Sequence, residues 1–242
     1  FGDDYRERAR RAAKAFPALQ RFLERNPPPI ATAQPAGQIR ALVDGSDEIK
    51  QVLARELFQR FEKWVLQFQG YREGKHDYPK NVIGFARTLR RLMITYELLR
   101  KDGFLSDEQI RKLHAYFGFA ARRILDEGRW PHSKTWMHPD HPESTRDFYT
   151  YPGEHRPDKF IWTNCLPNFQ SDPLCALLHL SALLPEHPDA SRWQRFALDD
   201  IDRQLDAYCS ESGAWEESVN YALFTFFYFN VTFRIVKNRL GV

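Results

Sequence analysis

Two short segments of the 242-residue chain concentrate side chains that can bind a polar ligand and move a proton. The first segment runs from Trp162 to Asp172 and is rich in amides, and the second runs from Gly213 to Tyr221 and carries carboxylates and a phenol. Amides donate and accept hydrogen bonds, and a phenol or a carboxyl group can exchange a proton. The chain between the segments predicts one helical hairpin, which would return it to the same end of the fold. We therefore expect Asn168 and Tyr221 to share the rim of one cleft.

The order of these pieces resembles the heparinase II/III-like polysaccharide lyases and the related alginate lyases, over about residues 105–235. In those families an Asn, usually followed by His, opens an inner helix. A hairpin with a Pro-rich break and a Trp follows, and then an acidic turn and a Glu-x-Ser-x-x-Tyr motif. Here Asn168 opens the helix, Pro185–Pro188 and Trp193 follow, and residues 216–221 complete the motif. The resemblance implies an (α/α) toroid and a chain that is a fragment of a longer protein.

The chemistry that the resemblance implies is β-elimination at a uronic acid. A proton leaves the carbon next to the carboxylate, and the bond to the 4-oxygen breaks. Because the carboxylate's charge opposes carbanion formation, a donor must bind it as charge develops. This resemblance makes Asn168 the neutralising amide and Tyr221 the base, the acid to the leaving oxygen, or both. Glu216 matches the acidic position of the family and is expected to orient a neighbour.

The sequence departs from the family at Phe169, which stands where the partner His is usual. Phenylalanine neither donates nor accepts a proton, so a loop histidine replaces it, Gln170 supplies a neutral donor, or activity is lost. Asn164 is an alternative to Asn168 as the amide donor. The loop histidines are His132, His138, His141 and His155, and the expected substrate-binding residues are Asn164, Gln170, Trp162, Trp215, His155, Arg156 and Tyr151.

Each of these residues also has a purely structural interpretation. Asn168 follows a proline and can serve as a helix cap. Tyr221 lies on an aromatic helix and can belong to the core. Glu216 and Glu217 can simply favour a helix N-terminus. The histidines between prolines show no metal-ligand spacing, so we expect no metal and no other cofactor.

The elements that must position these residues are helical. Apolar residues recur at spacings of three and four, and prolines, glycines and capping serines mark the ends. The pattern predicts an all-α fold, a complete or incomplete (α/α) toroid built from antiparallel hairpins. Helices are expected at 3–25, 46–68 (after a polar linker), 80–101, 106–128, 170–184, 189–208 and 216–238. We expect one domain over 1–242, with an N-terminal helix and linker (1–45), hairpins (46–128), a long loop (129–167) and site-bearing helices (168–242).

Aromatic residues make up 14% of the chain and form two populations. The Phe-rich last helix is apolar all round, which predicts burial on every side. The loop at 129–167 is rich in Trp, Tyr, Pro and His and shows no helical period. Long loops of this kind are usually functional, and its rings could stack on sugars.

Composition narrows the classes of function. A hydrophobic content of 43% excludes a disordered chain, and a net charge of +3 is too small to argue for nucleic acid. No apolar run reaches the length of a membrane span. Basic pairs such as Arg122-Arg123 are expected on solvated helix faces, and the three cysteines as buried small residues.

These observations leave three hypotheses in order. The first is a lyase that cleaves an acidic, uronate-containing polysaccharide, in a periplasmic or secreted setting that the resemblance implies. The second is a carbohydrate-binding or scaffold module that has lost catalysis. The third is a toroid glycoside hydrolase, which needs two carboxylates across the cleft. Only Glu216, Glu217 and Asp172 are placed to serve it.

Overall fold

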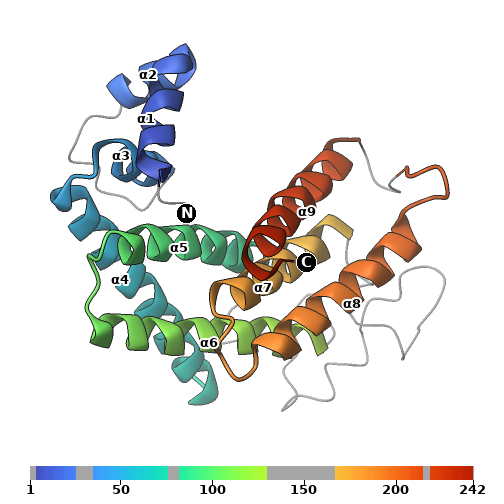
Figure 1. Ribbon diagram of the computed structural model, residues 1–242. Coiled ribbons are helices and arrows are strands. Elements are labelled where there is room, and N and C mark those ends of the chain that lie inside the picture. Colours follow the sequence, from blue (N-terminus) through green and yellow to red (C-terminus); the bar gives the residue numbers. More distant parts are fainter. Residues whose placement is uncertain (1–3, 26–34, 76–81, 130–166, 215–218, 242) are drawn as a thin grey trace. The chain divides into compact units, whose positions relative to one another are not determined.

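The computed structural model describes residues 4–25, 35–75, 82–129, 167–214 and 219–241 (Figure 1). The described residues form α-helices and no strand, which confirms the all-α prediction for this part of the chain. The helices are α1 (Tyr5–Ala15), α2 (Pro17–Arg25), α3 (Pro35–Asp44), α4 (Asp47–Arg72), α5 (Val82–Lys101), α6 (Asp107–Arg129), α7 (Pro167–Leu183), α8 (Ala190–Tyr208) and α9 (Val219–Leu240).

The chain divides into two compact units. Unit 1 comprises residues Phe1–Gln69 and Arg90–Tyr116, and unit 2 comprises Gly70–Leu89 and Phe117–Val242. The division therefore cuts the two long helices α5 and α6, so each unit contains one half of this hairpin.

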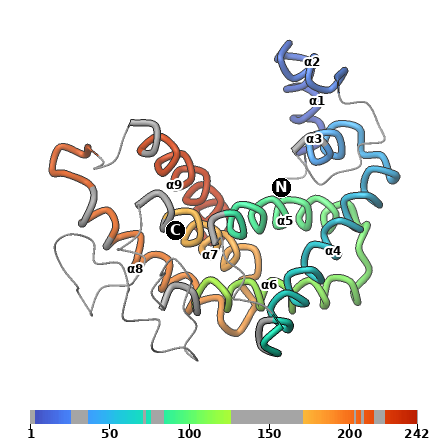
Figure 2. The backbone as a smooth tube through the Cα atoms, turned by 180° about the vertical axis from the view of Figure 1, so that it is seen from behind, coloured from blue at the N-terminus to red at the C-terminus, as the bar shows by residue number. Residues whose placement is uncertain are grey.

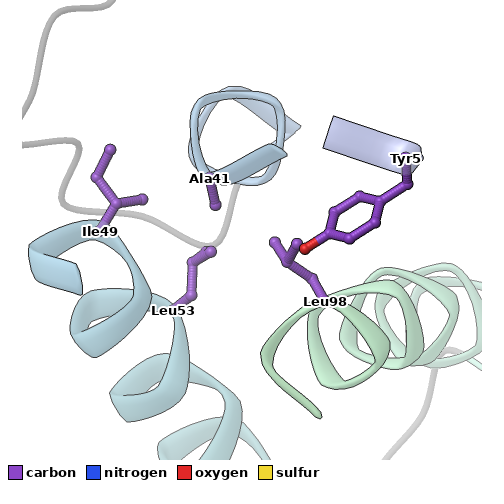
Figure 3. Close-up of a cluster of buried hydrophobic side chains, with 5 residues drawn as sticks. All are labelled: Tyr5, Ala41, Ile49, Leu53 and Leu98. Carbon is purple, nitrogen blue, oxygen red and sulfur yellow. The ribbon is translucent and has the colours of Figure 1, made fainter. Parts of the chain in front are cut away.

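A small apolar cluster holds the N-terminal helices in unit 1. Tyr5 of α1, Ala41 of α3, Ile49 and Leu53 of α4, and Leu98 of α5 are all buried (Figure 3). The cluster joins four helices through one side chain or two from each. Helices α1, α2 and α3 also pack against one another, so they form a compact N-terminal group.

The single helix predicted over 3–25 is wrong, because it is broken between α1 and α2. Phe16 has extended backbone angles (φ −111°, ψ 102°) and ends α1, and Pro17 begins α2. Proline disfavours helical angles in the residue before it and lacks an N–H for the helical ladder. The apolar stripe continued across this point, which hid the break.

The polar linker predicted up to residue 38 is also wrong at its end, since α3 begins at Pro35. Proline suits a first helical position. Helix α3 ends at Gly45, whose φ of +70° is a left-handed C-terminal conformation that glycine adopts without strain. Arg6 donates a hydrogen bond from Nη1 to the Ala41 carbonyl oxygen (2.7 Å), near this helix end, where a cation is favourable.

The predicted hairpin of α5 and α6 is confirmed, including its turn. Gly103 takes a φ of +65° after α5, and Ser106 precedes α6. The Ser106 Oγ accepts a hydrogen bond from the Gln109 backbone N–H (3.2 Å), and Gln109 Oε1 accepts one from the Ser106 N–H (2.9 Å). This reciprocal pair is a capping box, which satisfies two backbone donors at the start of α6.

Helix α7 is the centre of unit 2. All residues from 171 to 184 are buried, and α7 packs against both α8 and α9. The chain turns between α7 and α8 at the predicted Pro-rich break, where the His187 ring stacks on buried Trp193 with centroids 4.3 Å apart. Cys175 is buried in α7, as the small-residue interpretation predicts.

Helix α9 contradicts the prediction of burial on every side. It buries one stripe, formed by Thr225, Phe229, Thr232 and Val236. The opposite side exposes five large apolar residues by 39–63%, which are Leu223, Phe224, Phe226, Phe227 and Phe233. Apolar composition all round the helix indicates only that each side can be buried, since burial also requires a neighbour.

The solvated position predicted for Arg123 is wrong as well. Arg123 is buried, and its guanidinium lies 4.0 Å from the centroid of the Phe85 ring. A cation over an aromatic face is attracted by the ring's quadrupole, which helps to offset the cost of burial.

Candidate functional site

Helices α7 and α9 begin at the same end of unit 2. Figure 1 shows that α7 and α9 run in the same general direction, and that α8 returns the chain between them; Figure 2 shows the same from behind. Because α7 packs against both α8 and α9, this helical hairpin places the start of α9 near the start of α7. The sequence predicted this return of the chain.

Three of the predicted site residues lie in these two helix starts. Asn168 and Gln170 belong to the first turn of α7, and Tyr221 is the third residue of α9. Their backbone is helical, and their side chains lie outside the described part of the structure. The other predicted site residues lie outside the described residues altogether, and these are Glu216, Trp215, Asn164, Trp162, His155, Arg156 and Tyr151, with the alternative histidines His132, His138 and His141.

The register of α7 and α9 places the two predicted catalytic positions on defined faces. Asp172 lies four residues after Asn168 in α7, one turn further along the same face. In α9, Tyr221 precedes Thr225 by four residues and so continues the stripe that Thr225 begins. Tyr228 follows at the next turn of that face.

An ion pair between two distant segments lies one turn inside this end of α7. The Arg87 Nε of α5 is 2.7 Å from Asp172 Oδ2, and the Asp172 side chain is 0% exposed. The Arg87 guanidinium also lies 5.9 Å from the centroid of the Tyr228 ring of α9. The Arg87 side chain is 41% exposed, so a fully buried carboxylate orients a cation that solvent still reaches.

Further polar groups are buried where α7 meets α8. The Ser171 Oγ donates a hydrogen bond to Gln204 Oε1 (3.1 Å), and both residues are buried. His179 of α7 and Asp200 of α8 are buried too. Buried polar groups of this kind specify one packing of two helices, because any other packing leaves them unsatisfied.

Sequence reasoning missed Arg87. It lies in an amphipathic helix beside Phe85 and Ala86, and an arginine there is usually interpreted as part of a solvated face. A signal did exist in α7, where Asp172 is a carboxylate next to a long apolar run. A carboxylate that must be buried requires a cationic partner, although the sequence does not say which one.

The described residues offer no site for a bound metal ion, since they contain no group of three or more His, Cys, Asp or Glu side chains near one another. Among the same residues, no helix combines the length and the apolar character needed to cross a membrane. Comparison of the chain with protein-family models, with curated proteins and with solved structures gave no match.

Proposed function

We propose that the chain is the helical part of a polysaccharide lyase that cleaves a uronate-containing polysaccharide by β-elimination. The observation that supports this best is the shared end of α7 and α9, where the first turns carry Asn168 and Tyr221. A lyase needs an amide or cation at the substrate carboxylate and a proton-transferring group on the same sugar. Two helix starts side by side can supply both.

In this proposal Asn168 donates a hydrogen bond to the uronate carboxylate as negative charge develops there. Tyr221 then takes the proton from the adjacent carbon and returns a proton to the 4-oxygen as that bond breaks. Glu216 orients one of these groups. The products are a new reducing end and an unsaturated uronate at the other end of the cut.

Arg87 adds a positive charge to the same region. Its guanidinium is fixed by Asp172, one turn beyond Asn168, and is still accessible to solvent. A fixed cation near a phenol favours the phenolate and lowers the pKa of that phenol. Such a cation also attracts an acidic glycan. We therefore include Arg87 in the proposed site, although it is absent from the motif that suggested the lyase.

The architecture and setting of the enzyme are parts of the same proposal. The antiparallel hairpins α5–α6 and α7–α8 are the units from which an (α/α) toroid, complete or incomplete, is built. The expected partner is an acidic polysaccharide or oligosaccharide, and the expected setting is periplasmic or secreted. Neither a cofactor nor a metal ion has a role in this chemistry.

The test is the ultraviolet absorbance of unsaturated uronates after incubation with a panel of acidic glycans. We expect the band to form with the wild-type chain and to fall by at least about a hundredfold in rate in Tyr221→Phe, which removes the proton-transferring hydroxyl. Tyr116→Phe is the matched control, because Tyr116 stacks on Phe61 in unit 1 and is outside the proposed site. Equal rates for both variants would contradict the proposal.

One observation favours a second candidate, a carbohydrate-binding module without catalysis. Phe169 stands beside Asn168 in the first turn of α7, where a proton-transferring partner is expected. In the same assay this candidate predicts glycan binding without an absorbance band. New reducing ends without the band would indicate a hydrolase, but Asp172 is a poor acid for that reaction because it is buried and paired with Arg87.

A further inference from the structure

We propose that α9 is a dimerisation helix, and that two copies of this chain pair through it in antiparallel orientation. The surface in question, named here the α9 seam, is the exposed side of the helix. Its residues are Leu223, Phe226, Phe227, Asn230, Phe233, Arg234 and Lys237, all of them exposed. The inference is independent of the proposed lyase activity.

The spacing of the seam is that of a helix–helix interface. Its positions follow one another at intervals of three, one, three, three, one and three residues. This is a seven-residue repeat in which two core positions and one flanking position line a single stripe. The opposite stripe, which includes Thr225 and Phe229, is buried in unit 2, where α9 packs against α7. Helix α9 thus has two packing faces, and unit 2 uses one of them.

The seam is self-complementary about its central residue, Asn230. Under a two-fold axis through Asn230, residue n of one copy faces residue 460 − n of the other. Phe227 then faces Phe233 of the partner, and Phe226 faces Arg234 of the partner. Leu223 faces Lys237, and Asn230 faces its own copy. Every position of the seam therefore has a counterpart in the seam, as an isologous two-fold interface requires.

Charge selects the antiparallel orientation over the parallel one. Helix α9 contains no Asp or Glu, and its cations Arg234, Lys237 and Arg239 all lie in its last two turns. Parallel pairing would bring these cations together and repel the two copies. Antiparallel pairing separates them and places Arg234 over the partner's Phe226, where a cation–π contact is favourable. The lysine stem would cover the partner's Leu223 while its charge stays in water. A central Asn pair in an apolar seam also fixes the register.

The surface is large enough for a reversible dimer. With an aromatic side chain of roughly 200 Å², the exposed fractions of the seam's Leu and Phe residues give about 400 Å² of apolar surface per copy. The stems of Arg234 and Lys237 bring the total for two copies to about 1,000 Å², at the lower end of specific interfaces. We therefore expect dissociation in the micromolar range.

Sedimentation velocity over a range of protein concentrations tests the dimer. We expect a concentration-dependent monomer–dimer equilibrium in the wild-type chain. Phe227→Glu should weaken it by at least about tenfold, since it places a carboxylate in an apolar seam. Phe224→Glu is the matched control, because Phe224 is a similarly exposed residue of the same helix outside the seam. Circular dichroism verifies that both variants stay folded. A wild-type chain that stays monomeric at high concentration would overturn the inference, as would equal weakening by both variants.

Cysteine cross-linking tests the orientation separately. Asn230→Cys should form a disulfide-linked dimer on mild oxidation, beyond the background of the native cysteines in the wild-type chain. Leu223→Cys should not link to itself, since its two copies would lie about 20 Å apart along the helices, but should link to Lys237→Cys in a mixture. Self-linking of Leu223→Cys would instead indicate a parallel pair. A monomer whose seam binds anionic lipid vesicles would replace the dimer with a membrane surface, and failure of lyase activity would affect neither result.

Discussion

Asp102 is the residue on which the polar packing of unit 1 depends. Its carboxylate, 8% exposed, accepts hydrogen bonds from the Tyr5 hydroxyl and the Arg6 guanidinium, and it lies 3.3 Å from Lys50 Nζ. One acid therefore ties α1 and α4 to the end of α5. Burial, and then the hydrogen bond to Asp102, raise the pKa of Tyr5 to about 12.

This raised pKa predicts how the stability of unit 1 depends on pH. The neutral phenol is favoured in the folded state, so its contribution is complete below the unfolded pKa of about 10. The contribution is lost as the pH rises through the folded value of about 12. We expect wild-type protein to lose stability of the order of 2 kcal/mol over this window relative to Tyr5→Phe, which has no hydroxyl to ionise. Urea unfolding midpoints at several pH values between 8 and 12 measure the difference. Parallel curves for the two proteins would show that Tyr5 is not linked to folding.

At the scale of the element, the start of α6 offers a prediction about capping. Ser106→Ala removes the side-chain oxygen that accepts the Gln109 N–H. We expect a loss of about 1 kcal/mol in the free energy of unfolding, because that donor then has only water as a partner. Gln109→Glu keeps an acceptor for the Ser106 N–H and should cost little. Denaturant unfolding compares the variants with wild type, and equal losses in both would contradict a capping role for Ser106.

Helix ends were the best predicted features, because their signals are local. Gly103 and Ser106 marked the end of α5 and the start of α6 from sequence alone. The break at Pro17 and the short α3 were missed because an apolar stripe continued through one and a polar segment preceded the other. A period of 3.6 shows which side of a helix can be buried, and the capping residues show where it ends.

What packs against a helix could not be read in this way. The apolar surface of α9 predicted burial, but whether a neighbour exists is not written in α9 itself. The same holds for Arg87 and Asp172, which are 85 residues apart and meet only because the folded α5 and α7 pack together. The meeting of the starts of α7 and α9 was predictable because a single hairpin joins them. The roles of Asn168, Tyr221 and Glu216 stay predictions.

At the scale of the molecule, the burial of α7 predicts an order of local opening. Its residues 171–184 are buried without interruption between α8 and α9, whereas α8 and α9 each have an exposed side. We expect amide hydrogens of α7 to exchange more slowly than those of α8 or α9, because α7 is released only when its neighbours separate. Hydrogen exchange followed by mass spectrometry measures this per peptide. Exchange in α7 as fast as in α9 would show that α7 opens independently.

The position of Cys175 turns that interior into something that can be timed. Its thiol is 0% exposed at the middle of α7, while Cys209 after α8 is partly exposed. An alkylating reagent added to the native protein can reach Cys175 only during an opening of unit 2. The rate at which Cys175 is labelled therefore records how often this interior is exposed to solvent. The molecule carries its own chemical clock for any variant, ligand or glycan that stabilises unit 2.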